Sequence, residues 1–218
     1  MSEILAIDLA TKTGWCRGRI GETPEFGTMN FATKKKGIKG GTDMLLSGDS
    51  VFAAALDWIG ELLDPVPDIL IIESMLPPEA MRNKTSRQVR DRLAGLHGVV
   101  RAVARRKGVG EITEASVGDV RAHFIGQRNL KRDDAKRGVI DRCQALGWDV
   151  ANDNEADACA LWSFACALID PKTALSVTPL FNKALRVSEW PVKPPLTGTR
   201  IGRAGWSAFT AKASRSEK

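Results

Sequence analysis

The chain has 218 residues, a formal net charge of +6 and 43% hydrophobic residues, a length that allows one sizeable core with an appendage. It contains no run of eighteen apolar residues and no charged leader ahead of an apolar run, so we expect a cytoplasmic protein that does not cross a membrane. Its four cysteines never occur as Cys-x-x-Cys, so we expect reduced core thiols rather than disulfides or zinc ligands.

The positive charge is concentrated near the C-terminus. Residues 171–218 contain nine Lys or Arg against two Glu, which leaves about −1 for residues 1–170. The prolines, glycines and scattered charges of this stretch show no sustained period. We therefore expect a folded domain at 1–170 followed by a basic, loosely ordered extension at 171–218. Such an extension suits a polyanionic partner, although solubility alone explains many basic tails.

The first regular element is a strand at Ile4–Ile7 that ends in Asp8. Four consecutive apolar residues, two of them β-branched, are typical of a strand that is buried on both faces, and a Thr-Lys-Gly turn is expected to follow. A carboxylate at the end of such a strand is costly to desolvate unless it is paired or binds a cation. Asp8 therefore either caps the turn or serves as a ligand.

Periodicity and turn residues predict an antiparallel meander of three strands, followed by alternating helices and strands. The expected elements after the first strand are strands at Gly14–Ile20 and Pro24–Phe31, a loop at Thr33–Thr42, a helix at Asp43–Leu63, a strand at Ile69–Ile72, a helix at Thr85–Lys107, a strand at Glu111–Ala115, helices at Val117–Phe124 (capped by Ser116) and Lys131–Leu146, and a helix from Asp153 to Ile169. This order predicts an α/β fold with a central mixed five-stranded sheet, in which three antiparallel strands precede parallel ones and helices flank the sheet.

Two more acidic positions resemble Asp8. Glu73 follows the second continuously apolar strand, and Asp157 lies one turn into the last helix. Either Asp153 or Asn154 can cap that helix, and acidic residues in its first turn complement the helix dipole. Those roles do not account for Asp157, whose small neighbours allow the helix to lie close to the sheet. The predicted topology brings these three acids to the carboxyl ends of two central strands.

Three or four oxygen ligands around one cavity suit Mg²⁺ or Mn²⁺ rather than Zn²⁺. Such carboxylates serve phosphodiester hydrolysis by holding two ions roughly 3.5–4 Å apart, one activating a water and the other stabilising the leaving oxygen. Without the metals, the clustered negative charge would repel both itself and a DNA backbone. We therefore expect an absolute dependence on divalent cations.

The ordered acidic motifs resemble those of the RuvC-like Holliday-junction resolvases, which have the RNase H fold. The matching segments are Ile-Asp-x-x-x-x-x-Gly-Trp at 7–15, Pro-Asp-Ile-Leu-Ile-Ile-Glu at 67–73 and Asn-Glu-Ala-Asp-Ala at 154–158. Each motif is weak alone, and the ordered set is fairly specific. The resemblance covers roughly residues 3–169. It implies an endodeoxyribonuclease that cuts branched DNA and acts as a homodimer. It also implies two Mg²⁺ ions in each active site, for which Mn²⁺ can substitute. The shorter relatives encoded by bacteriophages and prophages are the members of this group that we expect the chain to resemble.

The resemblance also implies roles for single residues. Asp8, Glu73 and Asp157 match metal ligands, and Asn154 stands where the family has a fourth ligand, usually Asp or His. An amide oxygen coordinates more weakly than a carboxylate, so Asp153 or Glu155 is an alternative fourth ligand. Lys136 matches a basic catalytic residue that faces the scissile phosphate. We further expect DNA contacts from Arg121 and Lys131 in the same region, and from three lysines of the predicted basic loop, Lys34, Lys35 and Lys36, which otherwise form a solvated linker.

Two other functions are compatible with parts of this pattern. Asp8–Gly14 also resembles the phosphate-binding hairpin of sugar kinases and actin-like ATPases, although those proteins need two such domains facing a nucleotide. Asn154 in place of a charged ligand favours a protein that binds branched or single-stranded DNA without cutting it.

Overall fold

The computed structural model describes residues 2–31, 48–76 and 86–172. Within these residues, five strands form one mixed sheet in the order β3-β2-β1-β4-β5. The central strand β1 pairs antiparallel with β2 and parallel with β4, while β2 with β3 is antiparallel and β4 with β5 is parallel. The strands span β1 Glu3–Asp8, β2 Lys12–Arg19, β3 Glu25–Asn30, β4 Ile69–Glu73 and β5 Glu111–Ala115. The predicted five-stranded sheet is confirmed.

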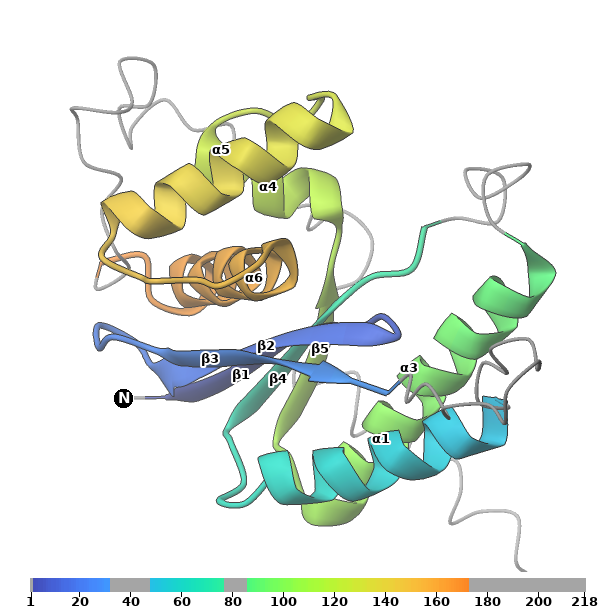
Figure 1. The fold of residues 1–218 in the computed structure, drawn as a ribbon. Coiled ribbons are helices and arrows are strands. Elements are labelled where there is room, and N and C mark those ends of the chain that lie inside the picture. Colours follow the sequence, from blue (N-terminus) through green and yellow to red (C-terminus); the bar gives the residue numbers. More distant parts are fainter. Residues whose placement is uncertain (1, 32–47, 77–85, 173–218) are drawn as a thin grey trace, which may run out of the picture. The chain divides into compact units, whose positions relative to one another are not determined.

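Helices cover both faces of the sheet. Figure 1 shows α4, α5 and α6 on one face and α1 and α3 on the other. The described helices span α1 Gly48–Leu62, α3 Arg87–Lys107, α4 Val117–Ile125, α5 Arg132–Ala145 and α6 Asp153–Ile169. Successive residues of a strand point to opposite faces, so Ile4 and Ala6 of β1 join the core under α6, while Leu5 and Ile7 join the core under α1 and α3. This two-sided burial explains the continuously apolar sequences of β1 and β4.

Most predicted helix ends agree with the structure. Ser86 caps α3 by accepting a hydrogen bond from the Val89 amide at 3.3 Å, and Ser116 caps α4 by accepting one from the Asp119 amide at 3.1 Å. The start predicted for the first helix, at Asp43, lies outside the described residues, as does the loop with Lys34, Lys35 and Lys36.

The predicted cap of the last helix was wrong. Asn152, rather than Asp153 or Asn154, is the N-cap of α6, with extended backbone angles of φ −160° and ψ 171°. Its side-chain oxygen accepts hydrogen bonds from the amides of Asn154 at 3.1 Å and Glu155 at 3.2 Å. Asp153 is therefore the first helical residue, and its carboxylate is free of the capping role.

The second strand begins two residues earlier than predicted. Strand β2 starts at Lys12 rather than Gly14, and Gly14 lies directly opposite Asp8. The turn is closed earlier by Thr13, which is fully buried and donates a hydrogen bond to the Ala10 carbonyl at 2.7 Å. This hydrogen bond closes the turn, and the antiparallel pairing of β1 with β2 places Gly14 beside Asp8.

Helix α6 is the main partner of the sheet on its face. Its residues from Ala158 to Ser163 are buried, and the Trp162 indole donates a hydrogen bond to the Gly18 carbonyl at 3.3 Å. The four cysteines are free and buried, as predicted. None of the helices in the described parts of the chain is long and apolar enough to span a membrane. Of the predicted extension, only residues 171 and 172 are described.

Candidate active site

Asp8 and Glu73 stand side by side at the same end of the sheet. Parallel pairing sets Ile7 opposite Ile72, so the next residue of each strand is one of the two acids. Each carboxylate follows four buried apolar residues. Because parallel strands end at a common edge, the sheet itself brings these two acids together.

Helix α6 carries the third acid to the same edge. Its first turn lies directly on β2, where the Asn154 carbonyl oxygen would be 1.9 Å from a Cβ atom added at Gly14. Asp157 follows Asp153 by four residues and so shares its face of the helix. The absence of a side chain at Gly14, opposite Asp8, permits this approach.

Burial and mutual repulsion raise the pKa values of the three acids. The pKa of Asp8 is raised to about 7, mainly by burial and then by the charges of Asp157 and Asp153. The pKa of Glu73 is raised to about 8 by burial and by Asp8 and Asp157. Burial also raises the pKa of Asp157 to about 6. The cluster therefore holds more negative charge than its surroundings stabilise, which is the condition that a bound cation relieves.

Two cationic side chains oppose this charge. Arg121 of α4 lowers the pKa of all three acids, and Lys136 of α5 lowers those of Asp8 and Asp157. The Nε atom of Arg121 is buried and has no hydrogen-bond partner among the described residues. Lys136 forms an ion pair with Asp153, and this hydrogen bond is the main cause of the lowered pKa of Asp153. Arg121 and Lys136 therefore lie close enough to the acids to offset part of their charge.

The three alternatives for a fourth ligand differ in their contacts. Glu155 is buried and accepts hydrogen bonds from Thr28 at 2.8 Å, the Ala151 amide at 2.8 Å and Asn152 at 2.9 Å. Its two oxygens are thus used to fix the start of α6, which argues against Glu155 as a ligand. The side-chain amide of Asn154 donates to Asn152 at 3.3 Å and to Asp153 at 3.5 Å.

The donor set fits a hard divalent cation. The converging groups are carboxylate and amide oxygens, which Mg²⁺ and Mn²⁺ prefer, and their charge is incompletely balanced. In the described parts of the chain, no three His, Cys, Asp or Glu side chains already form a group that could hold a metal ion. Binding would therefore require side-chain rotations that draw the carboxylates inward.

Some residues of the site gave a weaker signal in the sequence. Asn152 and Glu155 occupy the N-cap and N3 positions, so an Asn-x-x-Glu pattern, related to a capping box, could have identified the true cap. Lys12 also contributes to the lowered pKa of Asp153; no motif indicated that role. Lys131, predicted to contact DNA, is the exposed N-cap residue of α5.

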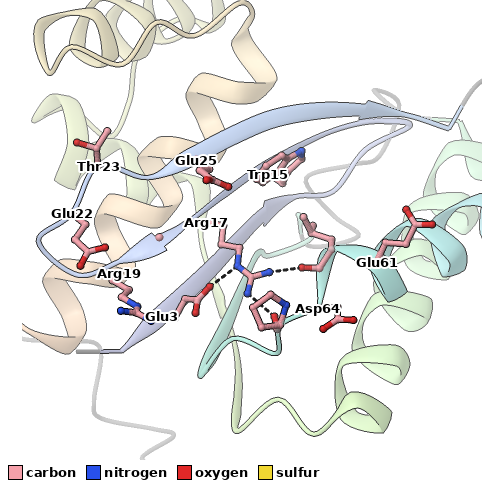
Figure 2. A pocket seen from close by; sticks show the side chains of 12 residues that line it. Glu3, Trp15, Arg17, Arg19, Glu22, Thr23, Glu25, Glu61 and Asp64 are labelled. Atoms are coloured by element: carbon pink, nitrogen blue, oxygen red, sulfur yellow. Dashed lines mark hydrogen bonds and ion pairs between the residues drawn. The ribbon is translucent and has the colours of Figure 1, made fainter.

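A separate hollow of about 550 Å³ lies on the other face of β2. Figure 2 shows Arg17 at its centre, bonded to Glu3 at 2.6 Å and to the carbonyls of Leu62 and Pro65. The two faces of β2 carry alternating residues. One face has Gly14, Cys16 and Gly18, which pack toward α6. The other face has Trp15, Arg17 and Arg19, which line the hollow. Because Arg17 already joins β1 to the end of α1, we assign it a structural role.

Comparison with known proteins gives a consistent result for the fold. No family model matches the chain, and no curated protein sequence matches it either. Among solved structures, the RuvC structure from Thermus thermophilus has a TM-score of 0.52 at 15% identity, covering 79% of this chain and 98% of that one. T. thermophilus RuvC in complex with a Holliday-junction substrate has a TM-score of 0.55 at 13% identity, covering 80% and 98%. The yeast mitochondrial Holliday-junction resolvase Ydc2 has a TM-score of 0.50 at 16% identity, covering 76% and 78%.

These similarities confirm the fold that the three motifs predicted. The sheet order β3-β2-β1-β4-β5, with helices on both faces, is shared with RuvC over about four-fifths of the chain. The chain has the RNase H-like fold of the Holliday-junction resolvases.

Proposed function

We propose that this protein is a Mg²⁺-dependent endodeoxyribonuclease that hydrolyses four-way junctions or related branched DNA. The observation that carries the proposal is the convergence of Asp8, Glu73 and Asp157 at one sheet edge, with pKa values raised by burial and with Arg121 and Lys136 opposite them. Similarity to RuvC, which has been solved with a Holliday junction, supports DNA as the substrate class.

In this proposal Asp8, Glu73 and Asp157 hold two Mg²⁺ ions, or Mn²⁺ in their place, and Asn154 lies at the fourth position. When bound, the two ions supply Lewis-acid activation of a water and charge stabilisation for the departing oxygen. Strand pairing and the packing of α6 on β2 fix the backbone positions of the three acids, and rotation of their side chains onto the ions would complete the site before substrate arrives.

The cationic residues act on the DNA in the same proposal. Arg121 and Lys136 attract the phosphodiester toward a cluster that would otherwise repel it, and Lys136 contacts the scissile phosphate. In the same proposal the DNA backbone is also contacted by four lysines, Lys131, Lys34, Lys35 and Lys36, and the positive charge of residues 171–218 adds to the attraction. A homodimer would place two such sites on one junction.

The test is cleavage of a synthetic four-way junction by the full chain in Mg²⁺, beside Asp8→Asn. Asp141→Asn, which changes an exposed aspartate of α5, is the matched control. We expect the wild type and the control to cut in Mg²⁺ or Mn²⁺ but not in EDTA, and the Asp8 variant to lose at least about 10³-fold in rate. Equal cutting by the Asp8 variant would refute the proposed site.

A DNA-binding protein without nuclease activity is the second candidate. It is favoured by the neutral side chain of Asn154 and by the engagement of Lys136 with Asp153. Tight binding of a junction, with no cutting in either Mg²⁺ or Mn²⁺ over a panel of junction sequences, would support this second function and exclude the first.

A further inference from the structure

The first turn of α6 offers a carboxylate that stands beside the proposed metal site without belonging to it. Asp153 is the residue before Asn154, and it lies one helical turn from Asp157 on the same face. Its charge contributes to the raised pKa of both Asp8 and Asp157. The Asp153 carboxylate is thus near the cluster, although its oxygen is bonded to Lys136.

We infer that Asp153 supplies the fourth carboxylate of the metal site by exchanging Lys136 for the metal, and that this exchange frees Lys136 to bind a DNA phosphate. The inference rests on the proposed function and replaces Asn154 as the principal fourth ligand. In this inference, metal binding releases Lys136, so the lysine becomes available to a DNA phosphate only when the metal is bound.

Charge balance is the first argument. Two divalent cations bring four positive charges, and Asp8, Glu73 and Asp157 supply three negative ones. Asn154 is neutral, so it adds an oxygen but no charge. Asp153 adds a fourth negative charge to the ligand set, and it is close enough to repel two of the three acids.

The contacts around Asp153 are the second argument. Asn152 caps the helix, so the Asp153 side chain is not needed for that role. Glu155 is held by three hydrogen bonds. The side chains of Lys136 and Asp153 are 31% and 34% exposed, so their ion pair is partly hydrated and able to change partners at low cost. Of the three acids in the first turns of α6, Asp153 and Asp157 are therefore available to bind a metal ion, whereas Glu155 is held by its hydrogen bonds.

Metal titration of the full chain without DNA tests the exchange. Free Mn²⁺ is counted by its electron paramagnetic resonance signal for the wild type and for Asp153→Asn, Asn154→Ala, Lys136→Met and the double variant Asp153→Asn/Lys136→Met. We expect Asp153→Asn to weaken Mn²⁺ binding about tenfold or more and Asn154→Ala to change it about twofold or less. The reverse order of these two effects would overturn the inference.

The double variant separates exchange from simple repulsion between Lys136 and the metal. If Lys136 competes with the metal for Asp153, Lys136→Met strengthens Mn²⁺ binding about fivefold or more in the wild type and about twofold or less beside Asp153→Asn. Equal strengthening in both backgrounds would mean that Lys136 acts only through its charge, and the exchange would be wrong.

The released lysine has its own signature in DNA binding. In EDTA, Lys136→Met should alter junction affinity about twofold or less in the wild type, where Asp153 holds the ammonium group. Beside Asp153→Asn, the same change should weaken binding about fivefold and reduce the salt dependence by roughly one phosphate contact. If Lys136→Met changes junction affinity equally in both backgrounds, Asp153 does not hold Lys136 away from the DNA.

Failure of this inference is distinguishable from failure of the proposed function. Asp8→Asn should abolish tight Mn²⁺ binding whether or not Asp153 is a ligand. Loss of binding in the Asp8 variant with full binding in Asp153→Asn rejects the inference alone. Full binding in the Asp8 variant rejects the metal site and, with it, the inference. Thermal unfolding in EDTA shows for each variant that the protein is folded.

Discussion

The Asn154 carbonyl oxygen lies against the backbone of Gly14, at a point where a Cβ atom would be 1.9 Å away. This contact holds the start of α6 over β2, and Gly14 is paired with Asp8 in the adjacent strand. A glycine in one strand thus sets how near the helix with Asp157 comes to the strand with Asp8. The glycine of the Gly-Trp pair in the first motif therefore has a packing role, because a side chain at position 14 would collide with the Asn154 carbonyl.

Gly14→Ala should therefore displace α6 and damage the site. An ordinary van der Waals contact needs about 3.4 Å or more, so helix or strand must move, and we expect a loss of about 2–4 kcal/mol in the free energy of unfolding together with weaker metal binding. Urea denaturation and Mn²⁺ titration measure the two effects. Gly60→Ala is the control, because no atom lies within 4 Å of its added Cβ, and it should be neutral or stabilising by up to about 1 kcal/mol.

The metal-free protein should lose stability as the pH rises from 5 to 8. Asp8, Glu73 and Asp157 have folded-state pKa values of about 7, 8 and 6, above the values near 4 of an unfolded chain. The contribution of their protonated forms is complete below the unfolded pKa and is lost as the pH passes the folded pKa. Urea denaturation in EDTA measures this slope.

Asp8→Asn isolates one part of that pH dependence. We expect it to match the wild type near pH 4 and to be more stable by about 2 kcal/mol at pH 8, because the amide carries no buried charge. Asp141→Asn should leave the slope unchanged. Saturating Mg²⁺ should raise wild-type stability more at pH 8 than at pH 5, and a wild-type stability that rises with pH in EDTA would contradict the assigned pKa shifts.

Glu155→Gln should weaken the fold while sparing metal affinity. The Glu155 carboxylate accepts hydrogen bonds from Thr28, Asn152 and the Ala151 amide. An amide side chain turns one of its two acceptors into a donor, so a buried donor faces another donor at a cost of about 1–3 kcal/mol. Urea denaturation should show this loss, and Mn²⁺ affinity should stay within about twofold of the wild type. A tenfold loss of Mn²⁺ affinity without destabilisation would restore Glu155 as a ligand.

Arg17→Met should destabilise the fold through the hollow in Figure 2. The Arg17 side chain is 12% exposed and binds the Glu3 carboxylate, whose side chain is 25% exposed, and the carbonyls of Leu62 at the end of α1 and of Pro65. Its removal leaves these acceptors without their protein donor. We expect a loss of about 2–3 kcal/mol by urea denaturation. Arg19→Lys, at an exposed position of the same strand, should change stability by about 0.5 kcal/mol or less. Junction cleavage well below the melting temperature should be retained, since Arg17 lies on the opposite face from Asp157.

Much of the fold follows from patterns that are local in the sequence. Two continuously apolar runs, each ending in an acid, predicted the central strands and the edge at which Asp8 and Glu73 meet. Ser116 was predicted to cap its helix because a serine that precedes a helix satisfies an unpaired amide. These features depend on neighbours along the chain, so they were predictable without coordinates.

The last helix shows where local reasoning failed. Asp153, Asn154 and Asn152 are all good capping types, and only the extended backbone of Asn152 and the bonds joining it to Glu155 and Thr28 select among them. Thr28 belongs to a strand more than a hundred residues away. The local Asn152-x-x-Glu155 spacing points to this cap, but the hydrogen bonds with Thr28 that hold it depend on the tertiary fold.

The sequence by itself determined that two buried strands end in carboxylates and that a third acid sits in the first turns of a helix, because burial and periodicity are properties of neighbouring residues. Only the tertiary structure decided what each charged group of that turn does: Asp153 is bonded to Lys136, Glu155 fixes the cap, and Asp157 joins Asp8. The reason is that a charge takes its role from the partners that surround it in space, and these partners come from β2, β3, α4 and α5.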